Sequence, residues 1–239
     1  MNPKSDSLFH FTKSLDVLQL ILKNGIEPRF CLEDITWLKI EGLNKIGLPM
    51  SCFCDIPISR LKNHNEFYGG FGIALSKDWA LKNGLHPISY TTEGGHIQEL
   101  ADSLKNIMNE NPTSEINALN FYRLISLVKP LTGLMKDKNG QDDIEVEFYQ
   151  ESEWRYVPKT LDIIPEDNFS RDVAQANERV KKYARKFNPT DVNYIFVSSD
   201  SDIPKIIDFI THELIIENER EVKILYSKVV SFERLRKDI

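Results

Sequence analysis

The sequence has little cysteine and no apolar run long enough to cross a membrane. Its first residues, 1–6, also lack the basic and apolar regions of a secretory signal, so we expect a cytoplasmic protein without a membrane partner. Cys31, Cys52 and Cys54 form an odd set, which argues against a disulfide framework and predicts reduced thiols. With 239 residues, the chain is long enough to fold without a disulfide or a structural metal.

Several ligand-binding motifs are absent as well. The sequence contains neither the glycine fingerprint of a Rossmann unit nor a P-loop, which disfavours nucleotide hydrolysis by a Walker mechanism. No second cysteine or histidine pair lies at the spacing of a zinc site. The formal net charge of −6 argues against a general nucleic-acid-binding surface.

Short strand-like and helix-like segments alternate along the whole chain, without a repeat or a flexible linker. Residues 8–11 predict the first strand, and the helix after them has apolar residues at helical spacing and Gly25 at its expected end. The remaining predicted strands are 49–56, 73–75, 88–91, 144–149, 153–157, 192–198, 222–226 and 229–232, and the remaining predicted helices are 76–82, 95–110, 114–129, 170–187 and 203–216. This pattern predicts an α+β fold in one domain, 1–239, with a helical insertion at about 95–130 and a C-terminal α/β extension at about 170–239.

His10 lies in the predicted first strand. Strand alternation places its imidazole on the face opposite Phe9 and Phe11. A single histidine in a strand is most often structural. His10 therefore becomes a candidate for chemistry only in the company of other polar residues.

A second group of candidates lies in the late segment 149–156. As a strand, this segment would point Glu151, Glu153 and Arg155 to one face. Two carboxylates on one face repel each other, and burial would raise the pKa of at least one of them unless Arg155 compensates. Two interpretations stay open: a polar functional site, and an exposed edge with an ion pair of little energetic value.

A glycine-rich segment with aromatic neighbours lies between these two groups in the sequence. Gly70 and Gly72 precede the predicted strand at 73–75 and would allow close approach of a flat ligand or of another backbone. Tyr68 and Phe71 would stack on an aromatic ring of that ligand. The alternative is a glycine-rich turn with packed aromatic side chains.

Taken in order, these segments resemble the ADP-ribosyltransferase superfamily. Residues 10–12 (His-Phe-Thr) and 21–26 (Ile-Leu-Lys-Asn-Gly-Ile) are similar to that family's His-x-Thr and Ile-Leu-x-x-Gly-Leu. Residues 70–75 are similar to its Gly-x-Gly-Ile-Tyr-Phe strand, although Ala74 stands where an aromatic residue is expected. Residues 151–153 (Glu-Ser-Glu) are similar to its Glu-x-Glu element.

This resemblance implies an ADP-ribosyltransferase-like split sheet of short strands with helical insertions, and NAD as the substrate. It implies that Glu153 holds the nicotinamide ribose and stabilises positive charge as nicotinamide leaves. It also implies that Glu151 takes a proton from the attacking group, which belongs to a protein or nucleic-acid acceptor of unknown identity. The residues implied to bind NAD are His10, Thr12, Arg29, Tyr68, Phe71 and Arg155.

A closer resemblance is to the AbiGi family of bacterial abortive-infection proteins, carried by residues 8–12, 49–57, 67–73, 77–79 and 153–155. It extends over nearly the whole chain and implies phage defence. The family is the antitoxin-like member of a two-gene system, which implies a toxin encoded by a neighbouring gene. Two functions stay open: an NAD-dependent ADP-ribosyltransferase or NAD glycohydrolase, and a non-enzymatic antitoxin that neutralises a toxin or regulates its operon.

A third interpretation, a metal-dependent hydrolase, is based on Asp55, His64, Glu66 and His96. Their spacing matches no familiar ligand motif, and solvated loop positions explain them better. The acidic residues at 200–202 precede a predicted helix and are interpreted as a capping turn. We therefore expect no metal.

Overall fold

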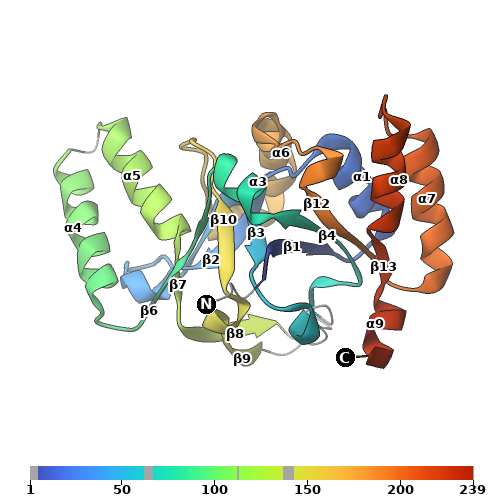
Figure 1. Cartoon of the computed structure of the whole chain (residues 1–239). Coiled ribbons are helices and arrows are strands. Elements are labelled where there is room, and N and C mark those ends of the chain that lie inside the picture. Colours follow the sequence, from blue (N-terminus) through green and yellow to red (C-terminus); the bar gives the residue numbers. More distant parts are fainter. Residues whose placement is uncertain (1–4, 62–66, 112, 137–142, 239) are drawn as a thin grey trace.

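The structure is a computed structural model that describes residues 5–61, 67–111, 113–136 and 143–238 (Figure 1). The strands are β1 (Ser7–Thr12), β2 (Arg29–Asp34), β3 (Lys45–Cys54), β4 (Phe71–Ser76), β5 (Leu85–Pro87), β6 (Ser89–Thr91), β7 (Val128–Pro130), β8 (Thr132–Lys136), β9 (Asp143–Glu147), β10 (Glu153–Tyr156), β11 (Ile164–Pro165), β12 (Val192–Val197) and β13 (Val229–Ser231). The helices are α1 (Leu15–Asn24), α3 (Lys77–Lys82), α4 (His96–Glu110), α5 (Glu115–Ser126), α6 (Phe169–Val180), α7 (Ile203–His212), α8 (Glu219–Ser227) and α9 (Phe232–Asp238).

One large sheet runs through the molecule in the order β13-β12-β4-β1-β3-β10-β5. All neighbours along this order are antiparallel except β12 and β13, which are parallel. The long strand β3 joins two parts of the sheet, because β2 and β11 pair with its first half and β1 and β10 pair with its second half. Phe9 of β1 and Glu153 of β10 are both partners of Cys54. The strands that carry His10 and Glu153 therefore lie on either side of β3.

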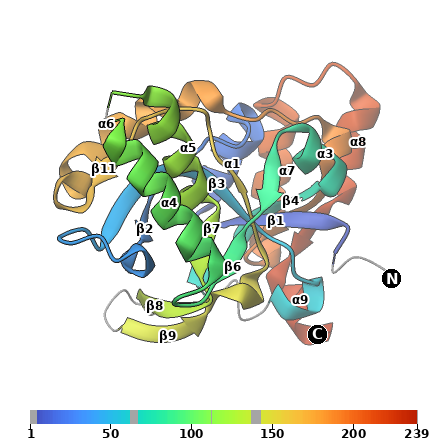
Figure 2. The same cartoon turned by 90° about the vertical axis from the view of Figure 1, so that its left-hand side faces the viewer.

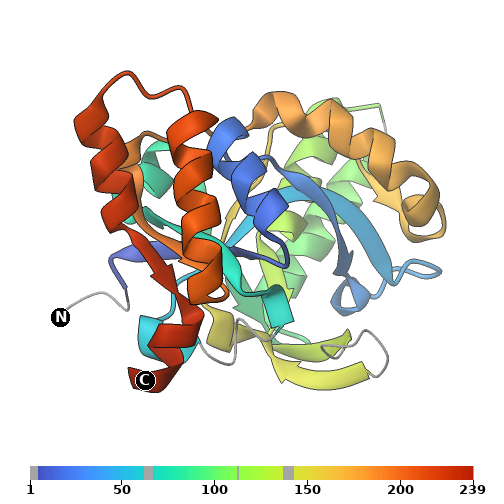
Figure 3. The ribbon, with the colours of Figure 1, turned by 90° about the vertical axis from the view of Figure 1, so that its right-hand side faces the viewer.

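Apolar side chains cover both faces of the sheet around β1, β4 and β12. On one face α1 and α7 pack against the sheet, with Ile21 and Ile206 in the core, and α8 lies beside α7 (Figure 3). On the other face Phe9, Phe196 and Phe232 form an aromatic cluster that is almost wholly buried.

The helices α4 and α5 form an insertion that packs against the other part of the sheet (Figure 2). Ala101 of α4 and Phe121 of α5 are buried against Leu48 and Met50 of β3. The parallel pair β6 and β7 connects this insertion to the sheet, so residues just before and just after the two helices lie side by side.

The predicted helices are largely confirmed. The side chains of Ser14 and Ser76 cap α1 and α3 by accepting hydrogen bonds from backbone N–H groups of the first turn. Gly25 ends α1 with φ 84°, and a Cβ there would lie 2.6 Å from the Arg185 carbonyl oxygen. Glycine is required at this position for both reasons. Residues 200–202 form the predicted capping turn before α7.

Some predicted strands are wrong. Residues 222–226 belong to α8, because the Asn218 side chain caps a helix there and Leu225 is buried on its inner face. The strand predicted at 144–149 ends at Glu147, and Phe148–Glu151 form a 3-10 turn followed by Ser152 at φ 46°. In the described ranges, every helix is too short or too polar to span a lipid bilayer.

Candidate functional site

A cavity of about 240 Å³, here called the central pocket, lies where β1, β2, β3 and β10 meet. It is lined by aromatic, thiol and charged side chains from segments far apart in the sequence. The lining residues are Phe9, His10, Phe11, Cys31, Glu33, Cys52, Phe53, Cys54, Tyr68, Lys129, Glu151, Glu153 and Arg155. Its volume lies just below the range of about 300–1,000 Å³ that is usual for small-molecule sites.

Glu153 and Arg155 form a buried ion pair at this pocket. The Arg155 Nε and Nη2 atoms lie 2.7 and 3.1 Å from the two carboxylate oxygens of Glu153. The same guanidinium donates to Glu33 Oε2 and to the Ser126 carbonyl oxygen at the end of α5, both at 2.8 Å. Arg155 is 1% exposed and Glu153 is 5% exposed. A two-point arginine contact of this kind fixes the orientation of both side chains.

Both members of this ion pair stay charged at neutral pH. Burial alone would raise the pKa of Glu153, but the positive charges of Arg155 and Lys129 outweigh burial and lower this pKa to about 2. Burial would likewise lower the pKa of Arg155, but the carboxylates of Glu33 and Glu153 raise it well above its usual range. The site therefore holds a fixed negative charge at Glu153.

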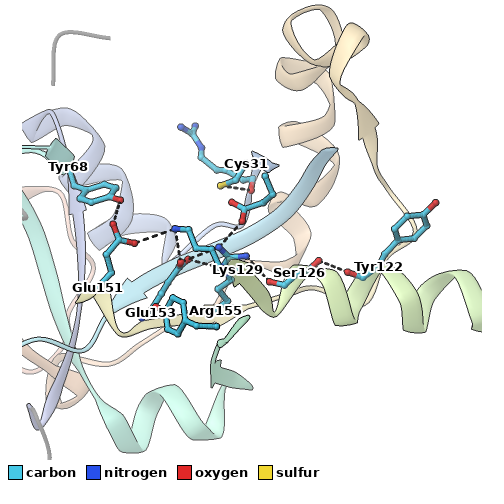
Figure 4. A network of polar contacts seen from close by, with 11 residues as sticks. Cys31, Tyr68, Tyr122, Ser126, Lys129, Glu151, Glu153 and Arg155 are labelled. Carbon is cyan, nitrogen blue, oxygen red and sulfur yellow. Dashed lines mark hydrogen bonds and ion pairs between the residues drawn. The ribbon is translucent and has the colours of Figure 1, made fainter. Parts of the chain in front are cut away.

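Lys129, from β7, lies between the two glutamates (Figure 4). Its Nζ atom is 3.3 Å from Glu151 Oε2 and 3.2 Å from Glu153 Oε2. It also lies 4.2 Å from the centre of the Phe148 ring, a cation–π contact. Burial lowers the pKa of Lys129, but Glu153 and Glu151 outweigh it and raise the pKa. Because the described lining of the pocket has three glutamates against one lysine and one arginine, it carries one formal excess negative charge.

Two tyrosine hydroxyls complete the contacts of the glutamates. Tyr68 Oη donates to Glu151 Oε1 at 2.6 Å, and burial together with Glu151 raises the pKa of Tyr68. Tyr90 Oη accepts a hydrogen bond from the backbone N–H of Glu153 at 2.9 Å, and burial raises the pKa of Tyr90 to about 12. Both hydroxyls keep their protons at neutral pH.

His10 is held as a neutral imidazole. Its Nδ1 atom lies 2.7 Å from the Cys52 carbonyl oxygen, which only accepts, so Nδ1 carries the proton and Nε2 carries a lone pair. Burial lowers the pKa of His10, although the hydrogen bond to Cys52 opposes this. The centres of the His10 and Phe53 rings are 5.2 Å apart.

His10 also borders a second, smaller cavity of about 80 Å³, here called the side cavity. Its lining includes Gly25, Glu27 and Arg29, just after α1. The two cavities are therefore neighbours. The central pocket holds Glu33, Glu151 and Glu153, and the side cavity holds Glu27 beside the exposed Arg29.

Most of the predicted site residues come together. His10, Tyr68, Glu151, Glu153 and Arg155 all line the central pocket, and Arg29 lines the side cavity. Thr12 and Phe71 are not among the described residues that line either cavity. They are partners in the pairing of β1 with β4, on the side of β1 away from β3 and β10, and Phe71 packs against the apolar core there.

Sequence reasoning missed Lys129, Glu33 and Tyr90. Tyr90 lies in β6, which the predicted strand at 88–91 covers, and Lys129 lies in β7, at the end of the predicted helix 114–129. The sequence does not indicate that these two strands pair and bring both residues to the glutamates. Glu33 lies two residues after Cys31 on β2, so both side chains are on the same face of that strand, but β2 has no clean period that would have revealed it. Cys31, Cys52 and Cys54 are free thiols. A hydrogen bond with Cys31 and burial both raise the pKa of Cys52, which makes it a poor nucleophile.

The described residues give no support to the interpretation as a metal-dependent hydrolase. Asp55 pairs with Lys77 at 2.8 Å, and the exposed His96 lies 3.2 Å from Glu99. Within the described part of the chain, no three His, Cys, Asp or Glu side chains are grouped so as to hold a metal ion. His64 and Glu66 lie outside the described residues.

The fold and the site together define a mixed α/β protein with a charged pocket at the centre of its sheet. Residues 24–198 match the family described as "Putative abortive phage resistance protein AbiGi, antitoxin". The chain is also 30% identical over 247 residues to the "Abortive phage resistance protein AbiGi" of Lactococcus lactis subsp. cremoris. That similarity covers 88% of this chain and 98% of the relative. The chain therefore belongs to the AbiGi family. No solved structure matched it.

Proposed function

We propose that this chain acts in abortive phage defence and that its central pocket binds the nicotinamide end of NAD. In this proposal the protein breaks the nicotinamide–ribose bond and passes ADP-ribose to an acceptor or to water. The observation that carries the proposal is the meeting of His10, Glu151 and Glu153 at one pocket from distant parts of the chain. Defence against phage is supported by the family to which the chain belongs.

The electrostatics of the pocket suit this chemistry. The nicotinamide ring of NAD is a cation, and the described lining carries one formal excess negative charge beside the aromatic rings of Phe53 and Tyr68. When the glycosidic bond breaks, positive charge develops on the ribose. A carboxylate held at fixed charge stabilises that transition state without having to reorganise. Glu153, whose pKa is about 2, provides this charge.

Glu153 and Glu151 would have different roles in the reaction. Glu153 is almost fully buried and oriented by Arg155, so it acts as the fixed negative charge. Glu151 has 18% of its side chain exposed and accepts hydrogen bonds from Tyr68 and Lys129, so it is the carboxylate that an acceptor can reach. In the proposal, Glu151 takes the proton of the attacking hydroxyl group or water.

The side cavity provides room for the rest of the dinucleotide. The central pocket alone is too small to enclose NAD, but His10 borders both cavities and Arg29 lines the second. The Nε2 lone pair of His10 would accept a hydrogen bond from a ribose hydroxyl, and Arg29 would neutralise the pyrophosphate. An ADP-ribosyltransferase-like arrangement of the strands is part of this proposal. It is supported by the positions of β1 and β10 on either side of β3.

A nicotinamide-release assay tests the proposal. The purified chain should release nicotinamide from NAD, and Glu151→Gln should lower the rate at least about 100-fold, the scale typical of a lost general base. Glu145→Gln, an exposed glutamate on β9, is the matched control and should keep the wild-type rate. Glu153→Gln should also be inactive, with its melting temperature measured alongside because Glu153 is buried. Full activity of Glu151→Gln and Glu153→Gln would overturn the assignment.

A second candidate function is that of a non-enzymatic antitoxin that binds a toxin encoded by a neighbouring gene or regulates the operon. The description of the matched family includes the word antitoxin. In addition, Glu153 is already paired with both Arg155 and Lys129, as in a purely structural ion network. Co-expression with the neighbouring gene separates the candidates. An antitoxin should neutralise toxicity even when His10→Ala and Glu151→Gln are combined, whereas an enzyme should lose its effect.

A further inference from the structure

A second large hollow lies away from the central pocket, with a volume of about 560 Å³. It is bounded by the connection between α7 and α8, the end of α1 and the segment before β12, and we call it the C-terminal groove. Among the described residues, it shares no lining residue with the central pocket or the side cavity. It is therefore a separate candidate for binding.

The floor of the C-terminal groove is apolar. Val192 and Leu225 are buried beneath it, and Phe187 is half-buried at its side. Ile215, in the connection between α7 and α8, is 98% exposed. Single exposed apolar residues are common, but Ile215 is also among the residues that line the hollow, so its side chain adds to the apolar area there. A partner that covers Ile215 would bury apolar area that is now in water.

The rim of the groove is acidic. Glu213, Glu217 and Glu221 line it, and Lys23 is the one basic residue in its described lining. Lys23 lies 3.6 Å from Glu213, and both side chains are more than half exposed, so this contact is weak. The rim therefore keeps a formal excess of two negative charges. Such a rim repels nucleotides and other anionic metabolites and attracts cations.

We propose that the C-terminal groove binds a basic amphipathic segment of a partner protein. The apolar side chains of that segment cover Ile215 and enter the hollow above Val192 and Leu225, and its lysine or arginine side chains face the glutamates of the rim. A second copy of this chain is a poorer occupant, because a two-fold contact would set the acidic rim against itself. The proposal is independent of NAD cleavage, since the described linings of the groove and the central pocket have no residue in common.

Two synthetic amphipathic peptides of equal length test this proposal, one built from leucine and lysine and one from leucine and glutamate. Binding to the full chain is followed by fluorescence anisotropy at low and at physiological salt. The lysine peptide should bind saturably and more weakly as salt rises, and the glutamate peptide should not bind. Ile215→Asp should weaken binding of the lysine peptide about tenfold or more, as expected for a central apolar contact.

The charge of Ile215→Asp makes this variant decisive. If the peptide were held only by general attraction to an acidic protein, the added carboxylate would tighten binding. Leu81→Asp is the matched control, because Leu81 is 60% exposed on α3 and the variant adds the same charge elsewhere. This control should bind like the wild type, and neither variant should lower the melting temperature.

Three outcomes would overturn the proposal. The first is equal binding of the two peptides. The second is unchanged or tighter binding of the lysine peptide by Ile215→Asp. The third is light scattering that shows a wild-type dimer and a monomeric Ile215→Asp, because the groove would then be covered by a second copy. Loss of nicotinamide release has no bearing on these results.

Discussion

The sheet around β4 and β12 is apolar on both faces, whereas the sheet around β10 buries charge. In the first region the rings of Phe196 and Phe232 stack with their centres 5.0 Å apart, and both residues are at most 2% exposed. In the second region Arg155 is as deeply buried but contacts Glu153 and Glu33. The first region therefore has a core without charges. The second has a core in which each buried charge depends on a partner of opposite sign.

The buried charges around β10 mark that region as the candidate for function. Buried ion pairs stabilise a fold poorly, because desolvation offsets most of the attraction, and well-packed apolar residues of similar size often do as well or better. Stability alone therefore does not explain why β10 carries Glu153 and Arg155 at the centre of the sheet. An arrangement that breaks the usual rule of an apolar core is typical of a functional site.

The largest effect should come from the apolar region. Phe196→Ala leaves a cavity among Phe9, Phe11 and Phe232, and we expect the free energy of unfolding to fall by about 4 kcal/mol. Because no charge is involved, this loss should be the same at pH 7 and at pH 4. Urea unfolding at both pH values measures it. A strongly pH-dependent loss would contradict the comparison of the two regions.

A somewhat smaller loss, about 3 kcal/mol, is expected for Arg155→Met at pH 7. This variant leaves the Glu153 carboxylate buried without its two-point partner. The double variant Glu153→Leu, Arg155→Met removes both charges and should recover most of the loss in the same urea experiment. If the double variant were as unstable as the single one, Arg155 would act through packing and not through charge.

The charged region should also respond to acid. Because the pKa of Glu153 is lowered to about 2 in the folded state, its contribution to stability is fully present above the unfolded pKa of 4.5. That contribution is lost as the pH falls from about 4.5 toward 2, and roughly 2 kcal/mol should be gone at pH 3. Glu153→Gln should lack this loss. The free energy of unfolding of the wild type and of Glu153→Gln should be measured from pH 4.5 to pH 2. An equal fall in both proteins would contradict the assigned pKa.

The regular parts of the fold were predictable because local signals agreed with the tertiary structure. Ser14 and Ser76 begin helices as expected, and the strands at His10 and Glu153 follow from alternation. The strand β2 was not predicted, because Arg29–Asp34 is only partly buried and has no clean period. The run at 222–226 was misassigned because its apolar residues fit either period, and only the cap at Asn218 distinguishes a helix.

The candidate site was predictable only in part. Glu151, Glu153 and Arg155 could be grouped because they are near one another in the sequence. Lys129 could not, because it reaches Glu151 and Glu153 through the parallel pairing of β6 with β7, after a helical insertion. Pairing between distant short strands leaves no local trace in the sequence.

The smallest loss in the free energy of unfolding, about 1 kcal/mol, is expected for Lys129→Met. This variant tests whether Lys129 belongs to the buried charges or to the edge of the pocket. The Lys129 side chain is 16% exposed, and its contacts with the glutamates, at 3.2 and 3.3 Å, are longer than those of Arg155. Methionine is of similar length but removes the charge that contacts Glu151, Glu153 and the Phe148 ring. Lys129→Arg is the control and should unfold like the wild type. A loss as large as that of Arg155→Met would mean that the two glutamates depend equally on both cations, and that Lys129 belongs to the buried network and not to the edge of the pocket.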